Sequence, residues 1–406
     1  MVSTEALRTV SALRRRTLRM LGAAAMAAAL GACSGFPTGG LFSPDPLPTP
    51  AGPPVQSTEI GAGRVKVALI LPLTAAGNAG AVAQSMRNAA ELALTEFNAP
   101  NVQLLVKDDN GTSSGAQQRA QEALDEGAEI ILGPLFSNAV VPAGQVARGR
   151  NVPMIAFSTD SSVAARGVYL LSFLPETDVE RVLDYSASRG KKSFAALIPE
   201  NAYGNVAEAA FRQSVARQGG RVVALERYPP DRNAMGEAAR RVAQALPQAD
   251  ALFIPDGPDG AIAVTQALVA SGANLKRVQL LGTGLWDDPR IASEPALQGA
   301  WYPAPDAAGF RGFSNRYRAK FGGDPVRTAT LAYDAVSLVA ALVKTQGPQR
   351  FSEQTLTTPS GFSGVDGVFR FKPEGTNERG LSILRVTSSG PQQQAPAPKA
   401  FSGSAT

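Results

Sequence analysis

Apolar runs alternate along this chain with segments whose apolar residues recur at the spacing of a helix face. The run Val65–Leu71 is rich in β-branched and aliphatic residues, and in the following segment Met86, Ala90 and Ala93 share one helical face. In the first series we predict strands at residues 65–71, 102–106, 129–132 and 153–156, and helices at 82–98, 116–126 and 140–148. Regular alternation of strand and helix predicts a parallel sheet with helices on both faces.

A second series with the same order begins after Pro175. Here we predict helices at residues 177–188, 206–218, 235–246 and 261–271, and strands at 193–198, 221–227, 251–254 and 279–282. Two further helices at 309–321 and 330–344 and a hairpin of residues 367–372 with 381–387 complete the folded part. These roughly 325 residues suffice for two lobes with their own cores, so the fold class is α/β with two lobes.

Polar or small residues follow nearly every predicted strand. Ligands of parallel sheets bind at the carboxyl ends of the strands, so we expect a cleft lined by these turns. Examples are Thr74, the Asp108-Asp109-Asn110 turn and the Gly282-Thr283 turn.

The first residues are typical of an export signal. Five arginines precede an apolar run from Met20 to Leu30, which is too short to span a bilayer but suits a signal-peptide core. The run ends in Leu30-Gly31-Ala32-Cys33, which resembles the lipobox of bacterial lipoproteins. That resemblance implies cleavage after residue 32 and acylation of Cys33, for instance with palmitate; a plain secretory signal is the alternative. By resemblance to enteric lipoproteins, Ser34 after the cysteine favours the outer membrane.

Both ends of the mature chain are rich in Pro, Gly, Ser or Gln. Residues 33–63 are predicted to be a lipidated tether, and residues 389–406 a disordered tail. The formal net charge of +5 owes +4 to the signal peptide, which holds five Arg and one Glu, so the mature chain is nearly neutral. The basic balance therefore does not indicate nucleic-acid binding.

Several short matches in the expected order resemble the type I periplasmic binding fold, in its leucine/isoleucine/valine-binding branch. They include Ile131-Leu132-Gly133-Pro134, Val152-Pro153-Met154-Ile155-Ala156, Tyr203-Gly204 and Tyr333-Asp334-Ala335. The resemblance covers residues 65–387 and implies three crossings between the lobes. Lobe 1 would comprise 64–175 plus 306–372, and lobe 2 would comprise 176–305 plus 373–388.

The same resemblance implies the ligand-binding residues. In the family a serine after the third strand and small hydroxyl groups after the fourth hold the ligand's carboxylate, and a tyrosine of lobe 2 closes on the ligand. The candidate cleft residues are accordingly Thr74, Ser137, Asn138, Ser158, Thr159, Asp160, Tyr203, Asp256 and Trp286. Asp160 departs from the pattern, since a carboxylate there would repel a ligand carboxylate. The expected glutamate for a ligand ammonium is missing, and Asp256 is the nearest substitute.

The segment from Leu280 to Pro305, with Trp286-Asp287-Asp288-Pro289 and Trp301-Tyr302-Pro303, is similar to lipoproteins that activate penicillin-binding proteins. That similarity implies a protein partner, a peptidoglycan synthase, bound by the same fold. Both tryptophans of the chain lie in this segment. Tryptophan is favoured in interfaces, although packing between the lobes would explain it equally well.

The composition argues against catalysis. The chain has no His and one Cys, which removes His-based triads, the commonest zinc ligand and any disulfide within one chain. Ser188-Arg189-Gly190-Lys191 has the Ser-x-x-Lys spacing of penicillin-recognising enzymes but lacks their other motifs. We expect no cofactor, no metal and no enzymatic activity.

Two functions therefore remain open for an envelope lipoprotein of the periplasm. The first interpretation is an activator of a penicillin-binding protein. The alternative is the binding component of an ABC transporter, with a permease as partner and an amino-acid-like ligand.

Overall fold

The computed structural model describes residues 58–97 and 101–401. The signal peptide expected at 1–32, the lipidation site Cys33 and most of the tether lie outside these residues. In the described part, no helix is both long and apolar enough to cross a membrane.

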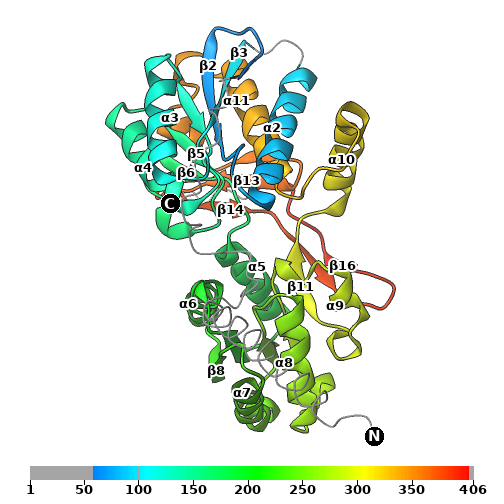
Figure 1. The fold of residues 1–406 in the computed structure, drawn as a ribbon. Helices are drawn as coiled ribbons and strands as arrows, with labels where there is room; N and C mark the ends of the chain where they lie inside the picture. Colours follow the sequence, from blue (N-terminus) through cyan, green and yellow to red (C-terminus); the bar gives the residue numbers. More distant parts are fainter. Residues whose placement is uncertain (1–57, 98–100, 402–406) are drawn as a thin grey trace, which may run out of the picture. The chain divides into compact units, whose positions relative to one another are not determined.

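Lobe 1 is built on a six-stranded sheet with the order β1-β3-β2-β4-β5-β6 (Figure 1). Its strands are β1 (Thr58–Ile60), β2 (Val65–Leu71), β3 (Val102–Asp108), β4 (Ile130–Leu132), β5 (Met154–Ala156) and β6 (Val168–Leu170). All neighbours are parallel except the edge strand β1, which is antiparallel to β3. The parallel sheet predicted from the alternation of strands and helices is thus confirmed.

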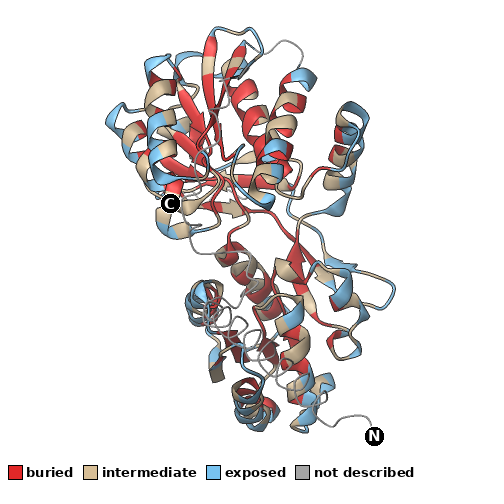
Figure 2. Cartoon of the chain, viewed as in Figure 1, coloured by how far each residue is buried: buried red, intermediate tan, exposed pale blue. Residues whose placement is uncertain are grey.

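Helices cover both faces of this sheet. Residues of α2 (Asn78–Glu96) and α11 (Ala329–Thr345) share one apolar core with it, and residues of α3 (Ser113–Asp125) and α4 (Ser137–Gly149) share the other. A further helix, α10 (Ala307–Phe321), packs against α2. Because both faces are covered, the parallel strands β2 to β6 are mainly apolar and are buried along most of their length (Figure 2).

Lobe 2 repeats this construction with a seven-stranded sheet, in the order β16-β15-β11-β10-β9-β7-β8. Its strands are β7 (Ser193–Pro199), β8 (Arg221–Tyr228), β9 (Ala251–Phe253), β10 (Gln279–Leu281), β11 (Trp301–Ala304), β15 (Ser382–Arg385) and β16 (Gln392–Ala395). One face packs against α5 (Pro175–Ser188) and α6 (Ala202–Arg217), the other against α7 (Arg232–Ala245) and α8 (Pro258–Ala270). The strands β7 to β11 are parallel, whereas β15 and β16 are antiparallel to their neighbours.

Short elements connect the larger ones. They are α9 (Pro289–Ser293), α12 (Glu353–Leu356) and the 3-10 helices η1 (Ser161–Val163), η2 (Leu246–Gln248), η3 (Leu275–Arg277), η4 (Gly284–Trp286), η5 (Pro295–Leu297) and η6 (Gly347–Gln349).

The predicted hairpin of residues 367–372 with 381–387 is wrong. A separate antiparallel sheet contains β12 (Phe362–Gly364), β13 (Gly367–Phe371) and β14 (Asn377–Arg379), while β15 joins the sheet of lobe 2 beside β11. Phe369 and Phe371 of β13 pack in the core of lobe 1. The third crossing therefore follows Arg379 and does not fall at residue 373, because β14 still pairs with β13.

The limits assumed for the tether and the tail also need correction. Residues 58–60, assigned to the tether, form β1 on the edge of the first sheet. Residues 392–395, assigned to a disordered tail, form β16 on the edge of the second sheet. Neither segment has an apolar pattern, because an edge strand is stabilised by backbone hydrogen bonds to one neighbour while its side chains stay largely exposed.

The helices begin one to four residues before the predicted positions. The predicted starts are late because the first turns contain polar capping residues, proline or glycine, whereas most predictions began at the first apolar residue of the helix face. For example, the side chain of Asn201 caps α6 by accepting from Gly204 N, and Asp231 caps α7 in the same way.

Candidate functional site

The first turns of the site follow β2 and β3 at the carboxyl edge of the lobe 1 sheet. The hydroxyl of Thr74 donates to Asp108 Oδ2 at 2.5 Å, and Asn110 N donates to Asp108 Oδ1 at 3.0 Å. Thr74 is exposed. One carboxylate thus ties the two turns together and holds an accessible hydroxyl at the sheet edge.

Asp109, the next residue, is fully buried. Its Oδ1 accepts from Gly111 N at 2.8 Å, but its Oδ2 has no hydrogen-bond partner among the described residues. Burial raises the pKa of this carboxyl to about 7, partly offset by the Gly111 hydrogen bond and reinforced by the charge of Asp108. Because Asp109 is fully buried, we regard it as a supporting group and not as a ligand contact.

Ser137 is the first residue of α4, where the chain turns sharply after β4. The turn needs Gly133, which has a φ of +92°, because a Cβ there would lie 2.0 Å from the carbonyl oxygen of Ile70. The hydroxyl of Ser137 has no hydrogen-bond partner within the described residues, and α4 has no side-chain cap. A free hydroxyl at a helix N-terminus is suited to an anionic group. The neighbouring Asn138 is held through its carbonyl oxygen, which accepts from Ser113 Oγ at 2.9 Å.

The turn after β5 holds the other lobe 1 candidates. Ser158 is buried, and its Oγ accepts from Asp160 N at 3.1 Å; Thr159 is half-buried. Asp160 is exposed, and its carboxylate accepts from the backbone and hydroxyl groups of Ser162 at 3.0 and 2.6 Å. Asp160 therefore caps η1, and its carboxylate already has local donors.

In lobe 2, Tyr203 lies in the first turn of α6 and donates its hydroxyl to Thr283 Oγ1 at 2.9 Å. Thr283 is fully buried in the turn after β10. Burial, together with the nearby carboxylate of Asp178, raises the pKa of Tyr203 above its usual range. The hydroxyl therefore stays neutral and fixed by this hydrogen bond.

Asp178 belongs to the same cluster, although it was not among the predicted residues. It stands in the first turn of α5 and accepts from Gly284 N at 2.8 Å. Burial raises the pKa of Asp178 to about 7, and the Gly284 amide and Arg379 oppose this shift. The signal that could have revealed it is the Pro175-Glu176-Thr177-Asp178 sequence, a proline and two acidic residues at a helix start.

The remaining lobe 2 candidates are Asp256 and Trp286. Asp256 accepts from the hydroxyl of Tyr228 at 2.6 Å and from Gly257 N at 2.7 Å, and burial raises its pKa. Trp286 is only 1% exposed, and its indole Nε1 donates to the carbonyl oxygen of Asp256 at 3.1 Å. The expectation that Trp286 lines the cleft is therefore wrong: its ring packs in the core of lobe 2, because the turn at Gly282 places it against that glycine.

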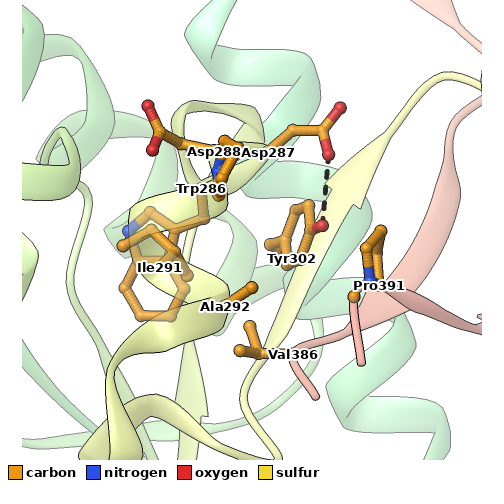
Figure 3. Close-up of a pocket in the computed structure, with 10 residues that line it drawn as sticks. Trp286, Asp287, Asp288, Ile291, Ala292, Tyr302, Val386 and Pro391 are labelled. Carbon is orange, nitrogen blue, oxygen red and sulfur yellow. Dashed lines mark hydrogen bonds between the residues drawn. The ribbon is translucent and has the colours of Figure 1, made fainter. Parts of the chain in front are cut away.

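On another side, the ring of Trp286 borders a pocket of lobe 2 (Figure 3). Tyr302 of β11 and α9 border the same pocket, whose volume is about 380 Å³.

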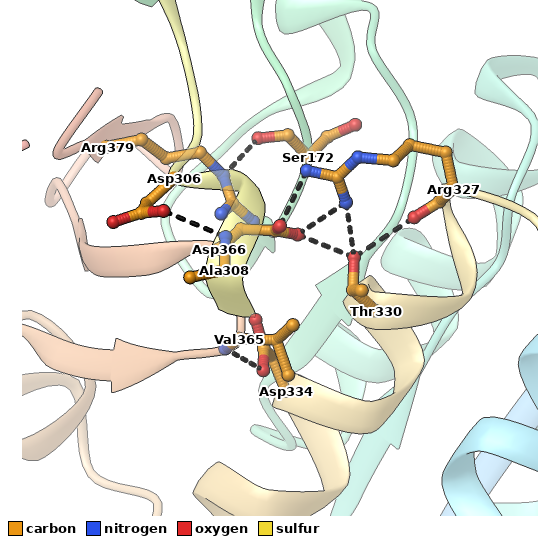
Figure 4. Close-up of polar contacts among 9 residues, drawn as sticks. All are labelled: Ser172, Asp306, Ala308, Arg327, Thr330, Asp334, Val365, Asp366 and Arg379. Carbon is orange, nitrogen blue, oxygen red and sulfur yellow. Dashed lines mark hydrogen bonds and ion pairs between the residues drawn. The ribbon is translucent and has the colours of Figure 1, made fainter. Parts of the chain in front are cut away.

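A network of charged residues lies beside the crossings between the lobes (Figure 4). Arg327 forms two hydrogen bonds with the fully buried carboxylate of Asp366, at 2.9 and 2.6 Å, and Thr330 donates to the same carboxylate at 2.6 Å. The free-energy cost of burying the Asp366 carboxylate is thus offset by its ion pair with Arg327 and its hydrogen bond from Thr330.

Arg379 is the other cation of this network. Its Nε donates to the carbonyl oxygen of Ser172 at 2.9 Å, but both terminal nitrogens are buried without a hydrogen-bond partner among the described residues. The guanidinium lies 4.6 Å from the ring centre of Phe173, and Arg327 lies 5.0 Å from the same ring. Burial lowers the pKa of Arg379, whereas the negative charges of the nearby Asp366 and Asp334 carboxylates raise it in part. These contacts connect the chain segment of the third crossing, at Arg379, to the segment of the first crossing, at Ser172 and Phe173.

The structure therefore assembles the candidates as two groups, one at the carboxyl edge of each sheet. Lobe 1 offers hydroxyl groups and a helix N-terminus, and lobe 2 offers a tyrosine, a threonine and buried carboxyls. The described residues hold no cluster of three or more His, Cys, Asp or Glu side chains that could bind a metal. Such groups can hold and orient a small ligand by hydrogen bonds.

Comparison with known proteins identifies the fold family. A family model described as periplasmic binding protein matches residues 64–391. Leu/Ile/Val-binding protein homolog 6 of Brucella melitensis is 25% identical over 185 residues, which is 44% of this chain and 46% of the relative. The chain thus matches less than half the length of this curated relative.

Solved structures share the fold over nearly their whole length. A protein from Rhodospirillum rubrum assigned to a branched-chain amino acid ABC transporter superposes with a TM-score of 0.72 at 22% identity, covering 81% of this chain and 99% of the other. A leucine-binding protein from Thermotoga maritima gives 0.55 at 19% identity, covering 82% and 98%. A solute-binding protein of an ABC transporter from Rhodopseudomonas palustris, in complex with 3,4-dihydroxybenzoic acid, gives 0.58 at 22% identity, covering 83% and 97%.

The two lobes with parallel sheets match these structures in fold, and the family model spans most of the chain. The resemblance read from the sequence is therefore confirmed at the level of the family: the chain belongs to the periplasmic binding proteins.

Proposed function

We propose that this protein is a non-enzymatic receptor of the bacterial periplasm that binds a small carboxylate and delivers it to an ABC permease. The observation that carries the proposal is Ser137, whose hydroxyl has no partner within the described residues and stands at the start of α4. In the family resemblance this serine holds the ligand's carboxylate. Hydroxyl and amide donors can bind a carboxylate without a buried basic side chain.

The class of ligand follows from the donors and from the similar structures. Leucine and 3,4-dihydroxybenzoic acid, named for two of those structures, both carry a carboxyl group. In this chain the carboxylates of Asp178 and Asp256 already accept hydrogen bonds within lobe 2. A ligand ammonium therefore has no preformed free partner in this group, so aromatic and aliphatic carboxylates without an ammonium group are included in the proposal beside amino acids.

Thermal denaturation tests the proposal. A panel of leucine, isoleucine, valine, benzoate and 3,4-dihydroxybenzoate should contain a compound that raises Tm, since a ligand at one hundred times its Kd stabilises the fold by about 2.7 kcal/mol. Ser137→Ala should reduce this shift, whereas Ser188→Ala, an exposed serine at the end of α5, should preserve it. The proposal fails if no carboxylate raises Tm, or if both variants respond like the unmodified chain.

A second candidate function is activation of a penicillin-binding protein, the first interpretation of the segment 280–305. The specific observation in its favour is the apolar pocket beside Trp286 and Tyr302, to which this segment contributes most of the lining residues. Crosslinking in cells followed by purification should then recover a peptidoglycan synthase. Recovery of a permease in its place would support the receptor and oppose the activator.

The proposed location is the periplasm, with the chain anchored through acylated Cys33 and the outer membrane favoured by Ser34. Labelling with radioactive palmitate should mark the protein, and Cys33→Ser should abolish the label and release the chain from membranes. Fractionation of the two membranes then distinguishes an outer-membrane anchor from an inner-membrane one.

A further inference from the structure

The pocket beside Trp286 differs in chemistry from the carboxylate site. It lies within lobe 2, between the turn that leads into α9, strand β11 and the loop that follows β15 (Figure 3). Its volume of about 380 Å³ falls within the range of small-molecule pockets.

The wall of this pocket is mainly apolar. Trp286, Ile291, Tyr302, Val386 and Pro391 contribute to it, and the first four of these belong to the buried core of lobe 2. The wall is therefore held rigidly by the core. A preformed apolar wall favours binding of an apolar group, because little conformational entropy is lost when the group enters.

Two carboxylates stand at the edge of the pocket, and they differ in their partners. Asp288 is paired with Arg290, which contacts both of its oxygens at 3.0 Å. Asp287 is exposed, and among the described residues its carboxylate accepts only from the hydroxyl of Tyr302, at 3.3 Å. No basic side chain of the described residues forms an ion pair with Asp287. In Figure 3 its carboxylate lies beside the Tyr302 hydroxyl, while that of Asp288 points the other way.

An apolar wall with one uncompensated negative charge at its edge complements an apolar compound that carries a positive charge. We propose that this pocket is a second ligand site, separate from the carboxylate site, which binds a small alkyl or aryl ammonium compound with its ammonium group on Asp287. The apolar part lies against Trp286, Ile291 and Val386. The site requires neither the proposed transport function nor its ligand.

The tryptophans of the chain provide a direct assay. Trp286 borders the pocket, whereas Trp301 packs edge-on against Tyr185 at 5.0 Å. The chain contains only these two tryptophans, so Trp301→Phe leaves Trp286 as the single fluorophore. In the full chain with this change, phenethylamine should alter the tryptophan fluorescence saturably. The neutral analogue 2-phenylethanol should bind about tenfold more weakly, the factor that corresponds to about 1.4 kcal/mol.

Two further measurements attribute the preference to Asp287. Asp287→Asn keeps an acceptor for Tyr302 and should lower the affinity for phenethylamine about tenfold while leaving that for 2-phenylethanol unchanged. Asp324→Asn, an exposed aspartate of lobe 1, should change neither. In the chain without the Asp287 change, high salt should weaken the amine and not the alcohol, since salt screens an exposed ion pair.

The proposal is overturned if phenethylamine gives no saturable change, if amine and alcohol bind equally, or if Asp287→Asn leaves the amine affinity intact. The salt measurement decides the question even if the Asp287 variant does not fold.

Discussion

The buried carboxyl of Asp109 gives the sharpest quantitative test of the structure. Asp109 is fully buried at the end of β3, and one of its oxygens has no partner among the described residues. Its pKa is raised from 3.8 to about 7, first by burial. In the unfolded chain the pKa returns to the usual value for aspartate.

The sign of the resulting pH dependence follows from proton binding. Between about pH 4 and pH 7 the folded chain keeps a proton on Asp109 that the unfolded chain has lost. The stability that this group contributes is therefore complete below pH 4 and is lost as the pH rises through 7. Because the pKa of Asp109 rises from 3.8 to about 7 on folding, the loss across this range is about 4 kcal/mol.

Asp109→Asn removes the ionisation and keeps an oxygen that can accept from Gly111 N. We expect the variant to have about the stability of the parent chain near pH 4 and to exceed it by about 4 kcal/mol near pH 8. Urea denaturation followed by circular dichroism at a series of pH values measures this difference. Asp324→Asn controls for the loss of a negative charge on the surface.

A difference between Asp109→Asn and the parent chain that stays constant from pH 4 to pH 8 would refute this reasoning. It would mean that Asp109 ionises in the folded chain as readily as in the unfolded one, and hence that the group is hydrated.

Three other substitutions test the packing and hydrogen bonds described above, each by urea denaturation. Gly282→Ala should destabilise lobe 2 by about 1–3 kcal/mol, because the new Cβ would lie 2.1 Å from the ring of Trp286. Its control is Gly236→Ala in α7. The new Cβ there meets nothing within 4 Å, so this change should stabilise the fold by up to about 1 kcal/mol. Thr330→Val should cost about 1–3 kcal/mol by removing a donor from the buried carboxylate of Asp366, and an unchanged stability would contradict the network. Tyr203→Phe should cost about 0.5–1.5 kcal/mol through the lost hydrogen bond to buried Thr283, and a gain in stability would show that this bond does not form.

The candidate site was predictable to differing degrees in its two halves. Ser137, Ser158 and Tyr203 lie at strand ends or helix starts, where the order of elements and the family resemblance place them. Trp286 was misplaced, since nothing local distinguishes a tryptophan that lines a cleft from one that packs behind it. Asp178 was missed although proline and acidic residues at a helix start are a recognisable signal, because its hydrogen bond to Gly284 N joins residues far apart in the chain.

By itself, the sequence determined the α/β class, the two series of strands and helices, and the family. These depend on apolar periodicity and local motifs, which are carried by residues close together in the chain. Only the tertiary structure decided which strands pair: β15 joined β11 instead of β13, and the polar segment at 392–395 became a strand. It also decided the burial of Asp109 and Arg379, and it placed Asp287, which forms no ion pair with another described residue, beside an apolar pocket. Such features depend on contacts between distant residues, and the energy of a charge is set by the groups and solvent around it, which no local pattern records.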